Sequence, residues 1–269
     1  MTNAVEDLRT GIAGCDISFD GVVQTFPTPT GTNVALESFD LSIRAGEFVA
    51  LVGPSGCGKT TAMNIAAGLV NPTAGSVLLG EDQPRLGNYD VGYLLARDCL
   101  QPWRTALENV MLPLEIRGVG KATAKAKAVS HLEAVGLGHA CDSYPAQLSH
   151  GMRQRVAVAR TLVFDPKVIL FDEPFSALDA QTKMNLQGML IKLWEQQRST
   201  VMFITHDLSE AIALADRVIV MSGHPGRILK EFRIELERPR NVLELQGDPL
   251  YHEYYQEIWS IIKTEMSEK

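Results

Sequence analysis

The sequence predicts an α/β protein with a mainly parallel sheet, to which an antiparallel β layer and an inserted helical region are added. Short apolar runs alternate with helical stretches, which is typical of parallel sheets. Several of these runs are apolar throughout, as expected of strands that are covered on both faces. The expected strands are residues 46–52, 91–95, 167–171, 200–204 and 217–221.

The first β segment differs from these strands. Residues 16–43 have β character, but the stretch 26–31 contains Pro27, Pro29 and Gly31. Prolines and glycines interrupt strands and favour turns. We therefore expect two antiparallel strands that are joined by a loop over residues 26–31.

The middle of the chain is predicted to be helical. Helical patterns without strand-like runs cover residues 105–117, 122–135 and 151–163. We expect one main domain, 14–240, whose core (14–96 and 161–240) carries a helical insertion over residues 97–160. Aromatic and aliphatic residues recur at helical spacing over residues 249–266, which predicts a docked helix within a C-terminal extension, 241–269.

Composition excludes several classes of protein. The 269 residues carry a formal charge of −7, which argues against nucleic acid as a partner. The apolar runs are far shorter than the ~20 residues that span a bilayer, and residues 1–10 lack the apolar region of a secretory signal. The four cysteines are scattered without a C-x-x-C pair, so reduced thiols are expected.

One segment matches the consensus G-x-x-x-x-G-K-[ST] of phosphate-binding loops, and it lies between an apolar run and a helical run as the motif requires. Glycines let backbone N–H groups point at phosphate oxygens, and the helix N-terminus adds positive potential. We expect Lys59 to neutralise the β- and γ-phosphates and Thr60 to offer its hydroxyl to Mg²⁺. The predicted nucleotide-binding residues are Gly53, Pro54, Ser55, Gly56, Cys57, Gly58, Lys59, Thr60 and Thr61.

Two adjacent carboxylates follow the apolar run 168–171. A parallel strand delivers the residue at its carboxyl end to the sheet edge where the phosphate loop lies. Asp172 is therefore predicted to hold Mg²⁺, directly or through water, together with Thr60. Glu173 is predicted to accept a proton from the water that attacks the γ-phosphate.

These segments are part of a longer series that resembles the ATP-binding-cassette (ABC) ATPases over roughly the first 225 residues. Residues 147–155, between the phosphate loop and the acidic pair, resemble the family's LSGGQ signature. Two more segments of the series, 176–179 and 204–207, follow the acidic pair. The segments 102–105 and 239–241 resemble the branch of importers for nitrate, sulfonate and taurine. The resemblance implies a RecA-like P-loop NTPase core and a helical lobe, with two such cassettes enclosing two ATP molecules.

The resemblance also assigns roles to single residues. Ser149 and Gly151 would bind the ATP held by the partner cassette, since Ser149 also has the character of a helix N-cap. His206 would contact the γ-phosphate and the attacking water. Asp179 would lie in the segment that crosses the interface between the two cassettes. Phe26 lies where the family has an aromatic that stacks on adenine, and the alternative is a core or loop aromatic.

Two positions depart from the family pattern. Ala96 stands where the family has a glutamine, and it neither coordinates Mg²⁺ nor orients water; Gln101 is five residues away. His150 replaces the first glycine of the signature, where the imidazole adds bulk or, if protonated, positive charge. Together, Ala96 and His150 predict slower turnover but not loss of ATP binding. The catalytic pair Glu173 and His206 is intact, so hydrolysis is still expected.

The expected function is that of a Mg²⁺-dependent, ATP-hydrolysing subunit of an importer. It would lie on the cytoplasmic side of the inner membrane and pair with a second cassette, with permease subunits and indirectly with a solute-binding protein. Trp103 is a candidate permease contact or a core residue. The alternative is a regulatory cassette that dimerises with ATP but hydrolyses little, which Ala96 favours. A soluble ABC ATPase acting on DNA or ribosomes is disfavoured by the single acidic cassette.

Overall fold

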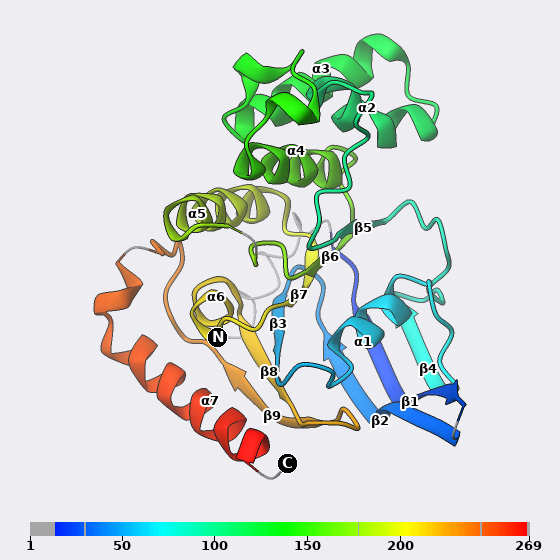
Figure 1. The fold of residues 1–269 in the computed structure, drawn as a ribbon, viewed down its shortest axis with the longest axis vertical. Helices are drawn as coiled ribbons and strands as arrows, with labels where there is room; N and C mark the ends of the chain where they lie inside the picture. Colours follow the sequence, from blue (N-terminus) through cyan, green and yellow to red (C-terminus); the bar gives the residue numbers. More distant parts are fainter. Residues whose placement is uncertain (1–13, 30, 177, 243, 268–269) are drawn as a thin grey trace, which may run out of the picture.

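The computed structural model describes residues 14–29, 31–176, 178–242 and 244–267. Residues 1–10, in which we found no secretory signal, lie outside this part of the chain. Helices and strands alternate along it (Figure 1). The predicted parallel strands and helices are confirmed, with ends that differ by at most two residues. In chain order the elements are β1 (Ile17–Thr28), β2 (Gly31–Ile43), β3 (Phe48–Val52), α1 (Lys59–Ala66), β4 (Ala74–Leu79), β5 (Val91–Leu94), α2 (Ala106–Ile116), α3 (Lys121–Ala134), α4 (His150–Leu162), β6 (Val168–Asp172), α5 (Ala180–Gln197), β7 (Thr200–Ile204), α6 (Leu208–Leu214), β8 (Arg217–Met221), β9 (Ile228–Arg233) and α7 (Pro249–Ser267).

The main sheet of the described residues has the order β5-β6-β7-β3-β8-β9. All neighbours in it are parallel except β9, which runs antiparallel to β8. The carboxyl ends of β3, β6 and β7 therefore meet at one edge of the sheet. The phosphate loop, the acidic pair and His206 follow these three strands, so the topology brings them together.

The apolar strands are buried on both faces, which explains their continuous hydrophobic runs. In β3, Val49 and Leu51 join a core shared with α1 and the smaller sheet. Phe48, Ala50 and Val52 point the other way, into a core shared with α5 and α6. Successive side chains of a strand face opposite sides, so one run supplies two cores.

The smaller sheet has the order β2-β1-β4 and is antiparallel. The loop predicted over residues 26–31 is shorter than expected, because β1 continues to Thr28 and pairs Phe26 with Asn33 and Pro27 with Thr32. Among the described strands, β4 pairs with β1 only as far as Val23. Pro27 therefore lies where β1 is an edge strand, and a proline is tolerated at an edge.

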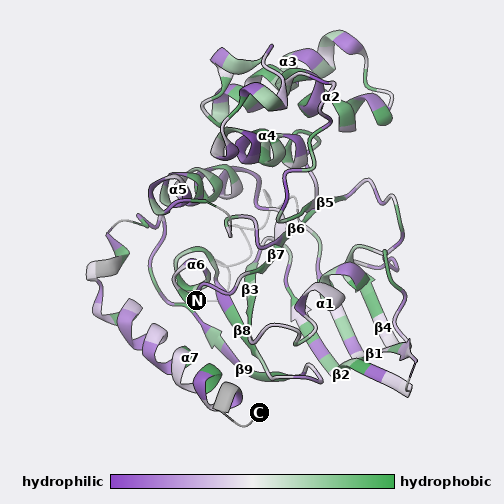
Figure 2. Cartoon of the chain, viewed as in Figure 1, coloured by the Kyte–Doolittle hydropathy of each residue, from purple (hydrophilic) through white to green (hydrophobic). Residues whose placement is uncertain are grey.

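Helices α2, α3 and α4 gather at one end of the molecule (Figure 1), where α4 contacts β5 of the main sheet. Helix α4 carries hydrophilic and hydrophobic residues in alternation (Figure 2), and its buried face includes Val156, Ala159 and Leu162. The predicted C-terminal helix is α7, which packs on α6 and β8 through Tyr251, Ile258 and Ile262. No helix in the described ranges is long and apolar enough to cross a membrane.

Candidate functional site

The predicted phosphate loop, acidic residue and histidine line one hollow of about 420 Å³. It opens at the carboxyl ends of β3, β6 and β7. Its walls come from the loop that starts α1, from the residues after β6 and β7, from β1 and β2, and from the turn between β8 and β9. The lining residues are Phe26, Asn33, Ala35, Ser55, Gly56, Cys57, Gly58, Lys59, Thr60, Thr61, Glu173, His206 and His224.

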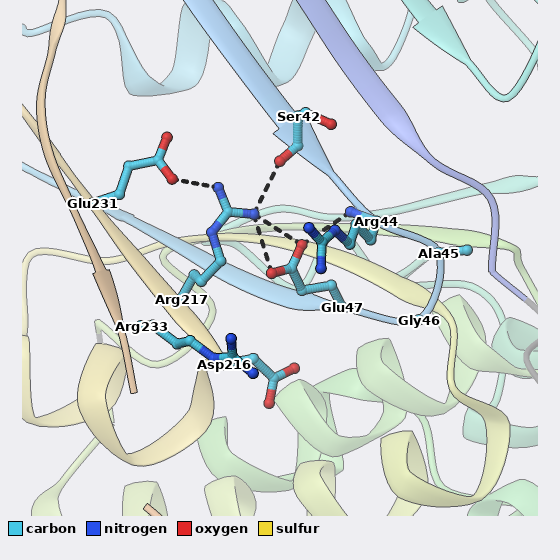
Figure 3. Close-up of a pocket in the computed structure, with 9 residues that line it drawn as sticks. All are labelled: Ser42, Arg44, Ala45, Gly46, Glu47, Asp216, Arg217, Glu231 and Arg233. Atoms are coloured by element: carbon cyan, nitrogen blue, oxygen red, sulfur yellow. Dashed lines mark hydrogen bonds and ion pairs between the residues drawn. The ribbon is translucent and has the colours of Figure 1, made fainter. Parts of the chain in front are cut away.

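A larger hollow of about 760 Å³ lies at the opposite, amino ends of β3 and β8 (Figure 3). Arg217 is at its centre and donates to the Glu47 carboxylate at 2.9 Å and to Glu231 at 2.6 Å. These ion pairs tie β3, β8 and β9 together. None of the predicted site residues lines this hollow, so we assign it a structural role.

Lys59 closes the phosphate loop on itself. Its side chain is only 7% exposed, and Nζ donates to the carbonyl oxygens of Gly53 and Pro54, each at 2.9 Å. Cys57 Sγ lies 3.4 Å from the same nitrogen. Gly53 and Pro54 do not line the hollow. Their carbonyl oxygens instead hold the Lys59 ammonium in place. The loop is thus preorganised for an anion, with a full positive charge at the start of α1.

Gly58 is required by both its backbone and its surroundings. Its φ is +91°, and a Cβ there would lie 2.6 Å from Ala35 O and 2.7 Å from Leu36 Cδ2. Gly56 has a similar φ of +79°, but nothing lies within 4 Å of the position that its Cβ would take. Gly58 therefore permits a close approach of the loop to β2, whereas Gly56 only permits a turn.

Replacing Gly58 with alanine is expected to destabilise the protein by about 3 kcal/mol, because left-handed strain and a backbone clash add together. Gly56→Ala is the matched control and should cost about 1 kcal/mol, from strain alone. Urea unfolding followed by circular dichroism measures both. Equal losses of stability would show that the clash with β2 does not matter.

Thr60 and Asp172 offer two oxygen ligands at the mouth of the loop. Thr60 Oγ1 lies 3.3 Å from Asp172 Oδ1. Burial raises the pKa of the Asp172 carboxyl, the charge of Glu173 raises it further, and the Thr60 hydroxyl and Lys59 oppose the shift. A dication would relieve this unfavourable burial of charge, and Mg²⁺ prefers such oxygen ligands. The residues therefore fit the predicted metal.

Glu173 and His206 are in contact within the hollow. His206 Nδ1 lies 3.2 Å from Glu173 Oε2, and both side chains are partly open to solvent, 60% and 35% exposed. The Glu173 N–H donates to Ile204 O at the end of β7, which ties the two segments together. Glu173 has a φ of +48°, an uncommon conformation for a residue with a side chain. The backbone thus directs this carboxylate into the hollow.

The turn that carries His206 is fastened by Lys183 and Glu210, which the sequence analysis did not single out. Thr205 Oγ1 donates to Glu210 Oε2 at 2.5 Å, and Lys183 of α5 donates to Asp207 at 3.1 Å and to Glu210 at 3.0 Å. Asp207 also caps α6. Lys183 reaches this turn from another helix, so no local pattern predicts its contacts.

Ser149, Gly151 and Asp179 do not line the hollow of their own chain. Ser149 caps α4 and accepts from Met152 N at 3.2 Å. Asp179 caps α5 and accepts from Thr182 N at 3.0 Å, and that backbone N–H lowers the pKa of the carboxyl. Gly151 lies against the Thr182 side chain, so the amino ends of α4 and α5 are adjacent. Their predicted contact with a nucleotide needs a second chain.

His150 is turned toward its own helix. Its Nδ1 lies 3.3 Å from Arg153 Nη2, and Arg153 also donates to Asp98 at 3.0 Å and to Leu148 O at 2.9 Å. A guanidinium only donates, so this bond requires an unprotonated Nδ1. The imidazole is therefore linked, through Arg153, to the segment that follows β5.

Ala96 lies two residues past the end of β5 and is exposed. In the β5–β6 register the last pair is Leu94 with Phe171, so Ala96 lies beyond the paired part of β5. Gln101 is not among the residues that line the hollow, and its backbone is bonded to Asn109 of α2 at 2.8 Å. Gln101 therefore does not stand in for the missing glutamine.

Comparison with known proteins adds to this geometry. Residues 36–176, more than half of the chain, match the ABC transporter family. The chain belongs to the ABC transporter family. It is 42% identical over 238 residues to the nitrate import ATP-binding protein NrtD of Synechococcus elongatus, covering 87% of each chain. It is 40% identical over 246 residues to the bicarbonate transport ATP-binding protein CmpC of the same species, covering 90% of this chain and 37% of that one.

A solved structure shows the same fold. The dimeric ATP-binding cassette in a post-hydrolysis state with ADP and Pi superposes with a TM-score of 0.73 and is 33% identical, and the match covers 82% of this chain and all of that one. The chain is therefore an ABC ATP-binding subunit and an ATPase with a P-loop NTPase fold. The family expectation made from the sequence motifs is confirmed.

Proposed function

We propose that this chain hydrolyses ATP to drive an importer for a small anionic solute such as nitrate, a sulfonate or taurine. One observation carries the proposal: the Lys59 loop and the Glu173–His206 pair line the same hollow. The relatives named for nitrate and bicarbonate support a small anion as the class of solute. Residues 241–269 form a C-terminal extension to an ATPase domain of residues 14–240.

The residues act in the following way. The loop amides and the Lys59 ammonium bind the triphosphate and neutralise its charge. Thr60 and Asp172 would hold Mg²⁺, which supplies further charge neutralisation at the phosphates. Glu173 accepts the proton of the attacking water, and His206, 3.2 Å away, orients that water and the γ-phosphate. Phe26 stacks on the adenine.

The proposed assembly contains two cassettes. Ser149 and Gly151 at the start of α4, with Asp179 at the start of α5, would meet the nucleotide held by the partner chain. The cassette dimer among the solved structures supports this arrangement. Permease subunits would anchor the chain to the cytoplasmic face of the inner membrane, and a solute-binding protein would deliver the solute outside. Trp103, which is 71% exposed, is the proposed permease contact.

The alternative of a regulatory cassette with little hydrolysis receives no support from the comparisons. Ala96 and His150 still predict slow turnover. The Ala96→Gln/His150→Gly variant restores the glutamine and the glycine of the family pattern, and turnover should rise about tenfold, or 1.4 kcal/mol of barrier. Steady-state ATPase rates of the assembled complex measure this, with Ala96→Ser as the control. A rate equal to that of the unmodified complex would contradict the prediction.

The test of the function is uptake into proteoliposomes that contain the chain with its permease. ATP-dependent uptake of nitrate, a sulfonate, taurine and bicarbonate is compared in the presence of the solute-binding protein. We expect one of these solutes to be accumulated and to stimulate hydrolysis. ATP hydrolysis that no membrane partner and no solute changes would contradict the importer proposal.

A further inference from the structure

The nucleotide hollow contains a histidine that no sequence motif predicted. His224 lies in the turn between β8 and β9, and it lines the hollow together with the phosphate loop and His206. Its side chain is exposed. Nothing in the local sequence marks this position, because the residue reaches the site only through the docking of its turn.

The turn is docked tightly against the phosphate loop and β2. Gly226 N donates to Ala35 O at 3.1 Å, and Glu37 N donates to Gly226 O at 3.0 Å. A Cβ at Gly226 would lie 2.0 Å from Cys57 O, so only glycine allows this approach. His224 is two residues from Gly226, within about 7 Å of it along the chain. The turn therefore holds His224 next to the predicted phosphate loop.

Hydrogen bonds inside the turn keep its shape. The Ser222 hydroxyl lies 2.9 Å from Pro225 O and accepts from Arg227 N at 2.9 Å. The Ser222 side chain thus closes the turn that contains His224.

The C-terminal helix holds the same turn from the other side. Glu265 Oε2, near the end of α7, accepts from Gly223 N at 2.9 Å. Glu265 lies three residues after Ile262 and seven after Ile258, on the face of α7 that packs against the core. The last described turns of α7 are therefore bonded to the residue that precedes His224.

We propose that His224 contacts the phosphates of the bound nucleotide and that Glu265 is a positioning residue that holds it there through Gly223. An imidazole donates at least one N–H in either protonation state, and phosphate oxygens accept such bonds. The inference rests on the proposed nucleotide site. It gives α7, a segment outside the ATPase motifs, an indirect part in nucleotide affinity through His224.

The test measures the dissociation constants of MgADP, and of MgATP in a Glu173→Gln background, by titration calorimetry on the full chain. His224→Ala should raise both constants about five- to tenfold, and His224→Asn, which keeps an N–H donor, should recover most of the affinity. Glu265→Ala should raise them about threefold, and Glu265→Gln, which keeps an acceptor oxygen, should not. Adding Glu265→Ala to His224→Ala should have no further effect.

Glu257→Ala is the matched control, since Glu257 lies on the same helix but pairs with Lys230 of β9. It should leave nucleotide affinity unchanged. Unchanged constants in His224→Ala, or an effect of Glu265→Ala that persists in the His224→Ala background, would overturn the inference. Lys59→Met separates this result from the proposed function. If both Lys59→Met and His224→Ala bind nucleotide normally, the proposed nucleotide site is wrong. If Lys59→Met loses binding and His224→Ala does not, only the role of His224 fails.

Discussion

Replacing Lys59 with methionine is expected to weaken nucleotide binding by about 100-fold or more. The variant keeps the buried stem but removes the ammonium that donates to Gly53 O and Pro54 O and that faces the hollow. Hydrogen bonds to charged groups contribute about 1.5–3 kcal/mol each, and 2.7 kcal/mol corresponds to a 100-fold change in affinity. Titration calorimetry with MgATP measures the effect directly.

The control for this experiment is Lys121→Met, which removes an exposed ammonium at the start of α3. It should bind nucleotide as the unmodified chain does, because α3 lies away from the hollow. A Lys59→Met protein with unchanged affinity and unchanged hydrolysis would remove the electrostatic basis of the whole site.

Replacing Glu173 with glutamine is expected to lower kcat by about 10²–10⁴-fold while ATP still binds. The amide keeps the shape of the side chain but does not accept a proton from the attacking water, and general-base catalysis contributes that factor. The contact with His206 Nδ1, 3.2 Å in the unmodified protein, would also lose its charge. Phosphate release and calorimetry on the same preparation separate hydrolysis from binding.

Glu253→Gln on the exposed side of α7 removes one carboxylate far from β6 and serves as the control. Its turnover should equal that of the unmodified complex. If Glu173→Gln hydrolysed ATP at the normal rate, another group would have to accept the proton, and the role of the Glu173–His206 pair would be wrong.

Much of the site was predictable because it is local in the chain. The phosphate loop needs a strand, a glycine-rich turn and a helix in succession, and all three are coded between residues 46 and 69. Asp172 ends the apolar strand β6, and Glu173 follows it directly. The structure places Lys59, Thr60, Glu173 and His206 around one hollow, as the motif order led us to expect.

Other features depend on contacts that the local sequence does not record. The proline-containing stretch 26–31 suggested a loop, but pairing with β2 extends β1 through Pro27, and Phe26 reaches the hollow from that strand. Asn33 and His224 line the same hollow without any motif to mark them. The link from His150 through Arg153 to Asp98 joins the signature segment to the loop after β5.

The sequence alone determined the fold class, the phosphate loop, the acidic pair and the family, because hydrophobic period and turn chemistry act between residues that are neighbours in the chain. Only the tertiary structure decided which distant groups without a motif complete the site: Asn33 of β2, the β8–β9 turn against Cys57, and Glu265, which is hydrogen-bonded to Gly223 of that turn. These contacts arise from strand order and helix packing, which bring together segments up to about 200 residues apart and leave no local pattern at either end.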